Sequence, residues 1–404
     1  MFNGLSVLKA FPRDVKILVM TRVLRSFGTA ILSVIFSIYL SKLGASSIAI
    51  GLTFTGVALF SAFRSLLEGM MADRYGRKPV LLFTSGLIVV GGVIMAFTNN
   101  ISVLMVTAVI FGVGFSYTPA EQAMLTEKVS SDERITAFSV NAFFGTVGSI
   151  FGSFLAGLPE TFQSIGFSEI ESYKPIFIIF AVIGAVTFLF FTLLNETMRS
   201  STMVESVDDA GKDERMILIK WSGVIALDIV GGSFTGKFLS YWYYLRFGVG
   251  LGQIGILFGL TRFLTLFSYI LGLKMAHRVG TIRATVISRL PVVVGTILTP
   301  LMPSYMLVAI LRLFMSLFSS IDVPLRQSYL MGVVKGRSRA SAVGVVTVVR
   351  GVTSAGIPSL TGYFFEYVSI DLPFYFASAF RLASASLMYY LFKDIKPEGE
   401  KQKM

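Results

Sequence analysis

The sequence predicts an all-α membrane protein with twelve transmembrane helices, arranged as two pseudo-symmetric six-helix bundles. Three observations predict this fold class. Only 14% of the 404 residues are charged and 54% are hydrophobic, whereas a soluble domain has roughly 25% charged residues. Apolar runs of about 20 residues recur along the chain, and a helix of that length crosses the hydrocarbon core of a bilayer. The second half of the chain also repeats residues of the first half at a nearly constant offset.

Twelve apolar runs, bounded by polar residues, glycine or proline, are the candidate spans. They are residues 16–43, 47–72, 79–98, 101–127, 135–158, 174–194, 216–246, 252–277, 282–302, 304–333, 338–365 and 372–392. A charged segment without apolar periodicity follows the sixth run, and we expect a solvated linker there. The predicted organisation is an N-terminal six-helix bundle (1–194), a cytoplasmic linker (195–215), a C-terminal six-helix bundle (216–392) and a cytoplasmic tail (393–404).

The repeat supports the division into halves. At an offset of 205, Pro119 and Gln122 in span four correspond to Pro324 and Gln327 in span ten. At an offset of 204, the run 72–76 (Ala-Asp-Arg-Tyr-Gly) corresponds to the run 276–280 (Ala-His-Arg-Val-Gly). Matches at nearly one offset, spread over several spans, indicate an internal duplication.

The distribution of Lys and Arg predicts the orientation in the membrane. If the N-terminus is cytoplasmic, the inner segments and the span edges beside them hold 22 of the 35 basic residues, and the outer loops hold three, Lys42, Lys174 and Arg246. Cytoplasmic loops carry such an excess. We therefore expect a multi-pass protein of the cell membrane with both termini inside. The net charge of +12 then needs no nucleic-acid partner.

The loop between spans two and three carries the most specific motif in the chain. Its spacing is Gly69-x-x-x-Asp73-Arg74-x-Gly76-Arg77-Lys78. This motif resembles the signature loop of the major facilitator superfamily of secondary transporters, most nearly its general and drug-efflux-like members, and the resemblance extends over essentially the whole chain. It implies two parallel repeats with a binding site at their interface, a small-molecule substrate, no cofactor and a monomer.

Ionisable side chains inside the spans are few. A charge at the bilayer centre costs about 2.5–3.5 kcal/mol or more, so each one is expected to face the bundle interior or water and to have a partner. Arg64 with Glu68, and Asp322 with Arg326, are four residues apart on one helix face and can pair. We expect either structural pairs near the cytoplasmic end or parts of an inner gate.

Glu121 in span four has no such partner within its own helix. It lies in the cytoplasmic third of the span, within reach of Arg74 or Arg77 in the loop. The resemblance implies that basic residues of the loop pair with acids at this depth, so we expect a gate latch rather than a substrate contact. Arg25, two or three turns into span one, is expected to extend to the inner surface.

Asp228 and Lys237 in span seven, and Arg262 in span eight, lie deeper. In a continuous helix Asp228 and Lys237 are about 13 Å apart along the axis and on opposite sides, so they cannot pair directly. Two interpretations remain open: pairing between helices with Arg262 nearby, or binding of substrate or protons. The sequence does not assign Arg289, Arg312, Arg350 or Arg381.

The expected function is secondary active transport of a small organic solute by alternating access. The chain has no Gly-x-x-x-x-Gly-Lys-Ser/Thr loop, so an ion or solute gradient is the expected energy source. Protons are the favoured ion, with Asp228 or Glu121 as carrier. A cavity rich in Phe and Tyr would suit amphipathic compounds, and the excess of bases in the spans would suit an organic or phosphate-like anion held by Lys237 and Arg262.

Glycines in span five predict close helix packing and bear on the direction of transport. Gly145, Gly148, Gly152 and Gly157 follow a small-residue spacing that permits close helix contact. Antiporters of the superfamily carry a Gly-Pro pair in this helix, whereas Ser153 follows Gly152 here. Export remains one possible direction, with weaker support than a complete motif would give.

Other classes of function fit less well. The chain has no Cys and a single His, so we expect no thiolate metal site, no metal cofactor and no enzyme based on histidine. A sensor without transport activity, built on the same scaffold, is a remote alternative because the tail after Lys393 is short.

Overall fold

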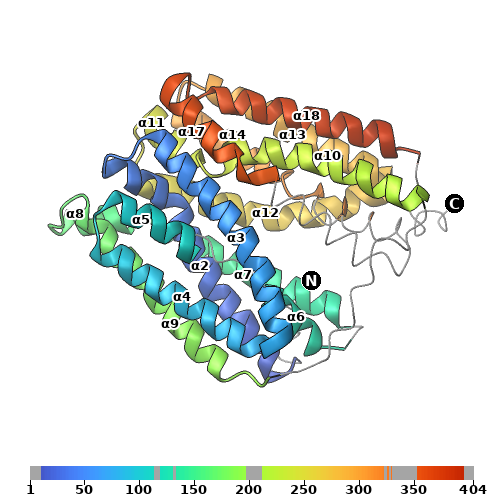
Figure 1. The fold of residues 1–404 in the computed structure, drawn as a ribbon. Coiled ribbons are helices and arrows are strands. Elements are labelled where there is room, and N and C mark those ends of the chain that lie inside the picture. The colour runs from blue at the N-terminus through green and yellow to red at the C-terminus, as the bar shows by residue number, and fades with distance from the viewer. Residues whose placement is uncertain are drawn as a thin grey trace. The chain divides into compact units, whose positions relative to one another are not determined.

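The computed structural model describes residues 11–112, 119–130, 133–196, 212–322, 325–326, 329 and 353–394. Every regular element in these ranges is a helix, so the predicted all-α class is confirmed (Figure 1). The helices are α2 (Arg13–Lys42), α3 (Ser47–Tyr75), α4 (Arg77–Phe97), α5 (Ile101–Thr107), η1 (Ala108–Gly112), α6 (Pro119–Glu127), α7 (Arg134–Phe154), η2 (Leu155–Gly157), α8 (Leu158–Ser164), η3 (Glu171–Tyr173), α9 (Lys174–Thr192), α10 (Lys212–Gly236), α11 (Leu239–Phe247), α12 (Leu251–Val279), α13 (Thr281–Leu298), η5 (Thr299–Leu301), α14 (Tyr305–Ser316), α17 (Ile357–Tyr367) and α18 (Leu372–Phe392).

The helices follow the predicted spans closely. Among the described residues, eight helices are long and apolar enough to cross a membrane, and they fall on spans one to three and five to nine. Spans four and ten contain the shorter helices α5, α6 and α14, and span twelve is α18. Span eleven lies partly outside the described residues and ends in α17. Helices suit these sequences because a helix satisfies its backbone hydrogen bonds internally, as lipid requires.

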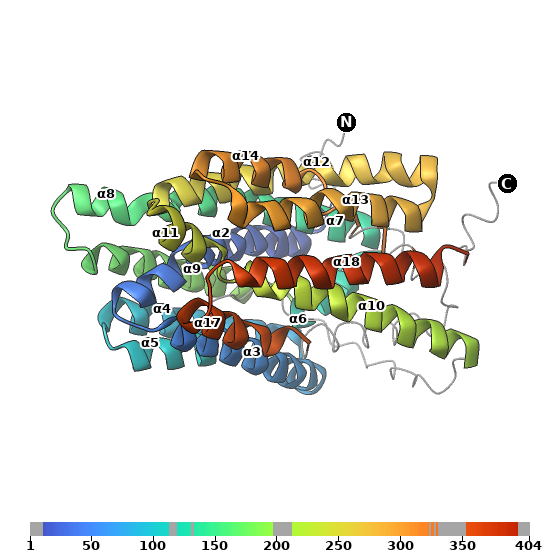
Figure 2. The same ribbon diagram turned by 90° about the horizontal axis from the view of Figure 1, so that it is seen from above.

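The chain divides into two compact units. The first contains residues 1–46, 56–201 and 243–260, and the second contains residues 47–55, 202–242 and 261–404. Within the first unit, α2 packs chiefly on α7, and α4 packs on α9. Within the second unit, α18 packs on both α10 and α13, and all three run side by side (Figures 1 and 2).

Glycines allow the closest helix contact in the first unit. A Cβ atom added at Gly148 would lie 2.3 Å from the carbonyl oxygen of Val23, and one at Gly152 would lie 2.1 Å from that of Phe27. The backbones of α7 and α2 therefore touch, as the small-residue spacing of span five predicts.

Aromatic side chains form a buried cluster in the second unit. The ring of Trp221 on α10 stacks on Tyr329 with centroids 5.0 Å apart. The edge of Phe392, at the end of α18, meets the Trp221 ring at 5.1 Å. All three side chains are buried, and this cluster holds α10 against α18.

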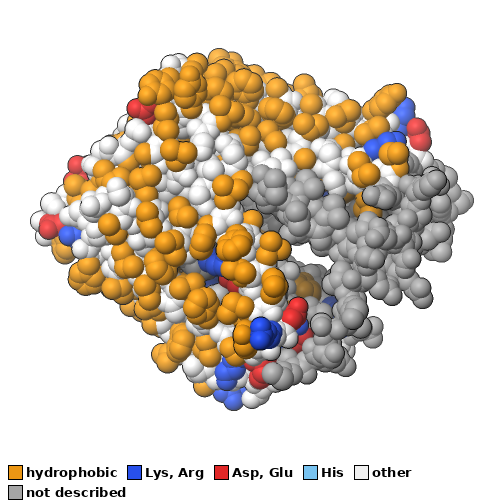
Figure 3. Space-filling view, viewed as in Figure 1, with side chains coloured by type: hydrophobic (Ala, Val, Ile, Leu, Met, Phe, Trp, Pro, Cys, Tyr) orange, Lys and Arg blue, Asp and Glu red, His pale blue; other side chains and the backbone are white. Residues whose placement is uncertain are grey.

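Large apolar side chains lie on the surface of the protein. Phe97 is 82% exposed, Tyr390 75% and Met70 69%. Figure 3 shows hydrophobic side chains over most of the visible face, with charged groups gathered in a few places. So much exposed apolar surface is typical of a face in contact with lipid rather than water, and the protein is a multi-pass membrane protein.

Two predicted spans are interrupted. Span seven is not the continuous helix that we expected, because α10 ends at Gly236 and α11 begins at Leu239, so Lys237 lies in the turn between them. In span ten, α14 ends at Ser316 and residues 317–321 form turns. Backbone that is not helical is tolerated at membrane depth only where it is buried in protein or lines a cavity. The second break therefore marks a place to look for a site.

Candidate solute-binding site and gate

The signature loop, residues 69–78, is helical except at Gly76, where the chain turns sharply between the end of α3 and the start of α4. Gly76 has a φ of +96°, and a Cβ atom there would lie 2.8 Å from the carboxyl carbon of Glu196. The Glu196 carboxylate accepts hydrogen bonds from the backbone N–H groups of Arg77 and Lys78, each at 2.9 Å. An anion at this position stabilises the N-terminus of α4. Glycine is therefore favoured at position 76 both by the positive φ and by the lack of room for a Cβ atom beside Glu196.

Arg77 is the centre of the loop's ion pairs. Its Nη1 lies 2.6 Å from Asp73 Oδ1, and its Nη2 lies 3.4 Å from Glu127 Oε1 at the end of α6. The ammonium group of Lys78 donates to the carbonyl oxygen of Thr192 at 2.7 Å. These contacts join the loop to the ends of α6 and α9.

The predicted partner of Glu121 is wrong. Glu121 is fully buried and pairs with Arg25 on α2, whereas Glu127 is the acid of span four that meets Arg77. Glu121 precedes Glu127 by six residues, about 9 Å along a helix, and so lies beyond the loop's reach. Arg25 is only 4% exposed, so it does not extend to the surface as expected. The guanidinium group of Arg74 lies over the ring of Tyr75, 5.4 Å from its centroid.

The two pairs predicted within single helices are present. Arg64 Nε lies 3.2 Å from Glu68 Oε1 on α3. Arg326 Nη2 lies 3.0 Å from Asp322 Oδ2. The second pair belongs to a larger network in the second unit.

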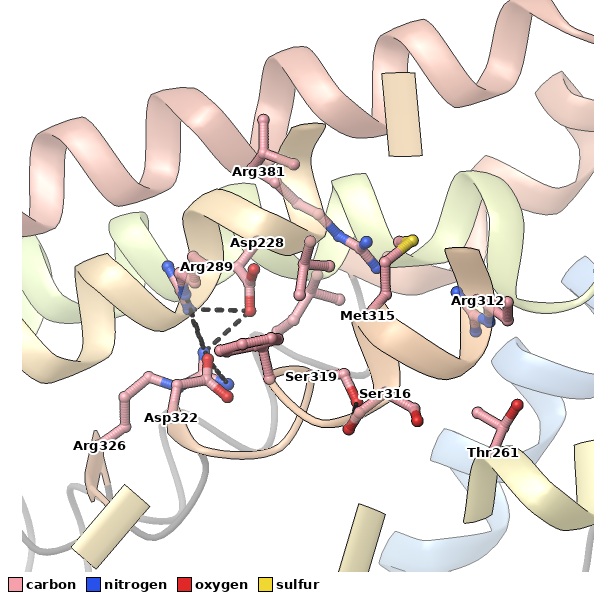
Figure 4. A pocket seen from close by; sticks show the side chains of 15 residues that line it. Asp228, Thr261, Arg289, Arg312, Met315, Ser316, Ser319, Asp322, Arg326 and Arg381 are labelled. Carbon is pink, nitrogen blue, oxygen red and sulfur yellow. Dashed lines mark hydrogen bonds and ion pairs between the residues drawn. The ribbon is translucent and has the colours of Figure 1, made fainter. Parts of the chain in front are cut away.

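The second unit contains a cavity of about 280 Å³ (Figure 4). It lies at the break that follows α14, where residues Ser316, Phe318 and Ser319 line it. Its charged lining comes from α10, α13, α14, α18 and the segment after α14. These charged residues are Asp228, Arg289, Arg312, Asp322, Arg326 and Arg381.

Four of these charged groups form a closed ring. Asp228 Oδ2 lies 3.1 Å from Arg289 Nη2 and 2.9 Å from Arg326 Nη1. Asp322 Oδ2 lies 3.1 Å from Arg289 Nη2 and 3.0 Å from Arg326 Nη2. Arg289 Nη1 also donates to Ser384 Oγ at 3.0 Å. The ring is neutral and links α10, α13 and span ten across one wall of the cavity (Figure 4).

Of the three deep residues that we expected to bind substrate or protons, only Asp228 lines this cavity. Asp228 does pair between helices, one of the two interpretations left open, but its partners are Arg289 and Arg326 rather than Arg262. Lys237 is exposed, and its ammonium group lies 5.9 Å from the centroid of the Phe54 ring. On α12 it is Thr261, the neighbour of Arg262, that reaches the cavity.

Sequence reasoning did not place the arginines of three further spans. Arg289, Arg312 and Arg381 all line the cavity, and Arg350, which was also unassigned, lies outside the described residues. The available signal was the presence of a charge in an apolar run. That signal marks a residue as important without saying which helix it meets.

Three features described above are typical of a membrane transport protein. They are the apolar helices, the charged signature loop with its ion pairs, and the charged cavity at an interrupted helix. The family model of the Major Facilitator Superfamily matches residues 18–297 and, in an overlapping match, 222–404. The chain belongs to this superfamily of secondary transporters.

Several known proteins are similar to this chain. It is 24% identical over 396 residues to the uncharacterized membrane protein YJR124C of Saccharomyces cerevisiae, with 88% of each chain covered. It is 22% identical to the multidrug resistance protein MdtG of Proteus mirabilis over 52% of each chain. It is 29% identical over 127 residues to the multi-drug resistance efflux pump PmrA of Streptococcus pneumoniae, covering 30% of this chain and 31% of PmrA.

Solved structures share the fold. A D-xylose-proton symporter superimposes with a TM-score of 0.73 at 13% identity, over 95% of this chain and 97% of its own. A bacterial homolog of the human lysosomal transporter Spinster gives a TM-score of 0.72 at 16% identity, over 94% and 96%. At these identities the likeness shows the fold and leaves the substrate open.

Proposed function

We propose that this protein moves a small organic solute across the plasma membrane by alternating access, driven by the proton gradient. The observation that carries this proposal is the cavity at the break after α14, where ionisable groups from five segments of the second unit meet. Transporters of this type bind their solutes beside interrupted helices near the bilayer midplane. The proposal further takes the protein to be a monomer with both termini in the cytoplasm.

The signature loop and its partners would act as the cytoplasmic gate. Arg77 joins Asp73 to Glu127, and these contacts connect the loop to the end of α6. Such exposed and half-buried pairs can open at moderate free-energy cost. The gate set also includes Arg64 with Glu68 and, in the second unit, Asp322 with Arg326.

Asp228 is our favoured proton carrier, because it faces the cavity that a solute would enter. Its carboxylate holds two guanidinium groups, those of Arg289 and Arg326. Protonation would remove the negative charge that holds them, so proton binding would rearrange the cavity wall. Glu121, fully buried against Arg25, is the second candidate.

The names of MdtG and PmrA favour export as the direction and amphipathic compounds as one substrate class. An anionic solute is the other class. A sensor without transport activity remains the alternative function for the scaffold.

Counterflow in proteoliposomes tests the proposal. Vesicles containing the purified protein would be loaded with one unlabelled compound at a time, from a panel of amphipathic cations, sugars and organic anions. We expect at least one labelled compound to exchange faster than in empty vesicles, and net uptake against its gradient to stop when a protonophore is added. Net uptake against a gradient that needs the protein but continues in the presence of the protonophore would contradict proton coupling. No exchange with any compound would favour the sensor.

A further inference from the structure

The cavity of the second unit carries more positive charge than its carboxylates can neutralise. Four guanidinium groups and two carboxylates line it, which leaves a net charge of plus two. Both carboxylates are already bound by the guanidinium groups of Arg289 and Arg326, at 2.9–3.1 Å. The surplus therefore lies on the other two arginines, Arg312 and Arg381.

Arg312 and Arg381 approach the cavity from different helices. Figure 4 shows Arg381 reaching from α18 toward Met315, and Arg312 on α14 beyond it. Arg381 Nη1 donates to Thr296 Oγ1 at 3.4 Å. Within the described parts of the chain, neither Arg312 nor Arg381 forms an ion pair with a carboxylate.

Two further acidic residues in the described part of the second unit, Glu366 and Asp371, are engaged elsewhere. The stretch 323–352, most of which lies outside the described residues, contains no Asp or Glu. Glu366 on α17 accepts a hydrogen bond from the backbone N–H of Ser47 at 2.7 Å. Asp371, before α18, accepts one from Trp242 Nε1 at 2.9 Å. Both carboxylates are thus engaged away from the cavity.

The remaining lining suits an organic molecule that bears an anionic group. Thr261, Ser316 and Ser319 supply hydroxyl groups, while Ile229 and Met315 supply apolar surface. A guanidinium group binds carboxylates and phosphates through two parallel hydrogen bonds, and it does so more strongly away from water. Two such groups, with no carboxylate at ion-pair distance among the described residues and beside hydroxyls and apolar walls, suit an anion.

The interrupted helix supports this assignment independently. Residues 317–321 are not helical, and the backbone N–H of Ser320 is satisfied by Ser268 Oγ at 3.2 Å. Discontinuous helices of this kind form the solute sites of many secondary transporters.

We propose that this cavity binds the anionic group, a carboxylate or a phosphate, of the transported solute through Arg312 and Arg381. The inference rests on the proposed function as a solute transporter and names the substrate class of its site. It replaces Lys237 and Arg262, which do not line the cavity, as the anion ligands. With a volume of about 280 Å³, the cavity is at the lower end of the range for small-molecule sites, so the solute is a small organic anion.

Matched probes can test the charge preference. Benzoate, benzamide and benzamidinium share one ring and carry a negative, a neutral and a positive group, and phenyl phosphate supplies the phosphate arm. The measurement is the Tm of the purified full-length protein in detergent at low ionic strength. We expect benzoate or phenyl phosphate to raise Tm, and the larger shift identifies carboxylate or phosphate as the preferred group. Benzamide and benzamidinium should leave Tm unchanged.

Variants then locate the site. Arg312→Gln and Arg381→Gln should each weaken the apparent Kd for the stabilising anion by about tenfold or more, since each removes charged hydrogen bonds. Arg381→Lys keeps the charge without the planar fork and should weaken binding less. Lys220→Gln, an exposed position on α10, is the matched control and should keep the full response. Gel filtration and the Tm without probe identify any variant that fails to fold, and the others still carry the test.

The results that would contradict the anion site differ from those that would contradict the proposed function. If benzamidinium stabilises the protein more than benzoate does, or if neither anion stabilises it more than benzamide, the assignment is wrong. It is also wrong if Arg312→Gln and Arg381→Gln both keep the response to the anion. Counterflow of a cationic or neutral solute without anion binding would refute this assignment and leave the transporter proposal intact. Anion binding that survives these tests without any transport would contradict the proposed function instead.

Discussion

Arg25 and Glu121 form an ion pair in which both side chains are almost entirely removed from solvent, at 4% and 0% exposure. Removing one partner of such a pair leaves a buried charge, which destabilises a protein by about 3–5 kcal/mol. Replacing both partners by apolar residues of similar size is often neutral.

We therefore expect Glu121→Leu alone to destabilise the protein by about 3–5 kcal/mol, and the double variant Arg25→Met with Glu121→Leu to recover most of that loss. Chemical unfolding in mixed micelles measures both. If the double variant is as unstable as the single one, the loss of stability does not come from leaving the charge of Arg25 buried without Glu121.

The signature loop gives a second expectation for single residues. Asp73→Asn or Arg77→Ala should slow transport and leave ligand binding largely intact, because both side chains lie in the loop and neither lines the cavity. The two readouts are counterflow rate and the Tm shift with the stabilising anion. Lys16→Gln, an exposed position on α2, is the control. If either loop variant is expressed normally but no longer binds the anion, the loop does not act as a gate.

Residue pairs within one helix could be predicted from spacing alone, and pairs between helices could not. Arg64 with Glu68 and Asp322 with Arg326 follow from the helical repeat. The ion-pair partner of Glu121 could not be predicted, because spacing does not show which helix faces Glu121. A charge in an apolar run implies that the residue has a partner. Which residue is the partner depends on helix packing, which a single sequence does not show.

Helices α2 and α7 touch through their backbones because Gly148 and Gly152 lack side chains. Gly152→Ala would place a methyl group 2.1 Å from the carbonyl oxygen of Phe27, so the helices would have to separate. We expect a loss of about 1–3 kcal/mol, typical of overpacking.

The control for this helix contact is Gly86→Ala on α4, where a Cβ atom meets nothing within 4 Å. The measurement is the Tm of Gly152→Ala and of Gly86→Ala in detergent, and we expect the lower Tm for Gly152→Ala. Equal stability of the two proteins would mean that the contact between α2 and α7 is loose.

Helix positions were predictable because about 20 apolar residues must span the bilayer, and α2, α3, α4 and α18 lie close to their predicted ranges. The breaks were not predictable. The turn at Lys237 and the one after Ser316 fall inside apolar runs, where periodicity continues and only packing shows that the helix stops. The cavity lies at the second of these breaks.

At the scale of the whole molecule, the distribution of Lys and Arg predicts which side of the membrane each loop faces. The chain has no Cys, so single cysteines can be introduced without removing others. Ser164→Cys, at the end of α8 in the predicted outer loop, should react with a membrane-impermeant maleimide in intact cells. Ser130→Cys, in the predicted inner loop after α6, should react only after permeabilisation. The reverse pattern would invert the topology. Both positions are exposed.

The internal repeat is the whole-molecule feature that the sequence reveals best. The positive-φ glycines Gly76 and Gly280 end α3 and α12 at corresponding places. Charge is not conserved between the repeats, since Glu121 corresponds to Arg326.

The most direct test of the central claim is proton movement driven by solute. Proteoliposomes with a pH-sensitive dye inside would receive a gradient of the transported solute and no imposed pH gradient. We expect the internal pH to change with wild-type protein and to stay constant with Asp228→Asn, while Lys220→Gln behaves as wild type. Solute entry without any change of internal pH in the wild-type vesicles would contradict proton-coupled transport.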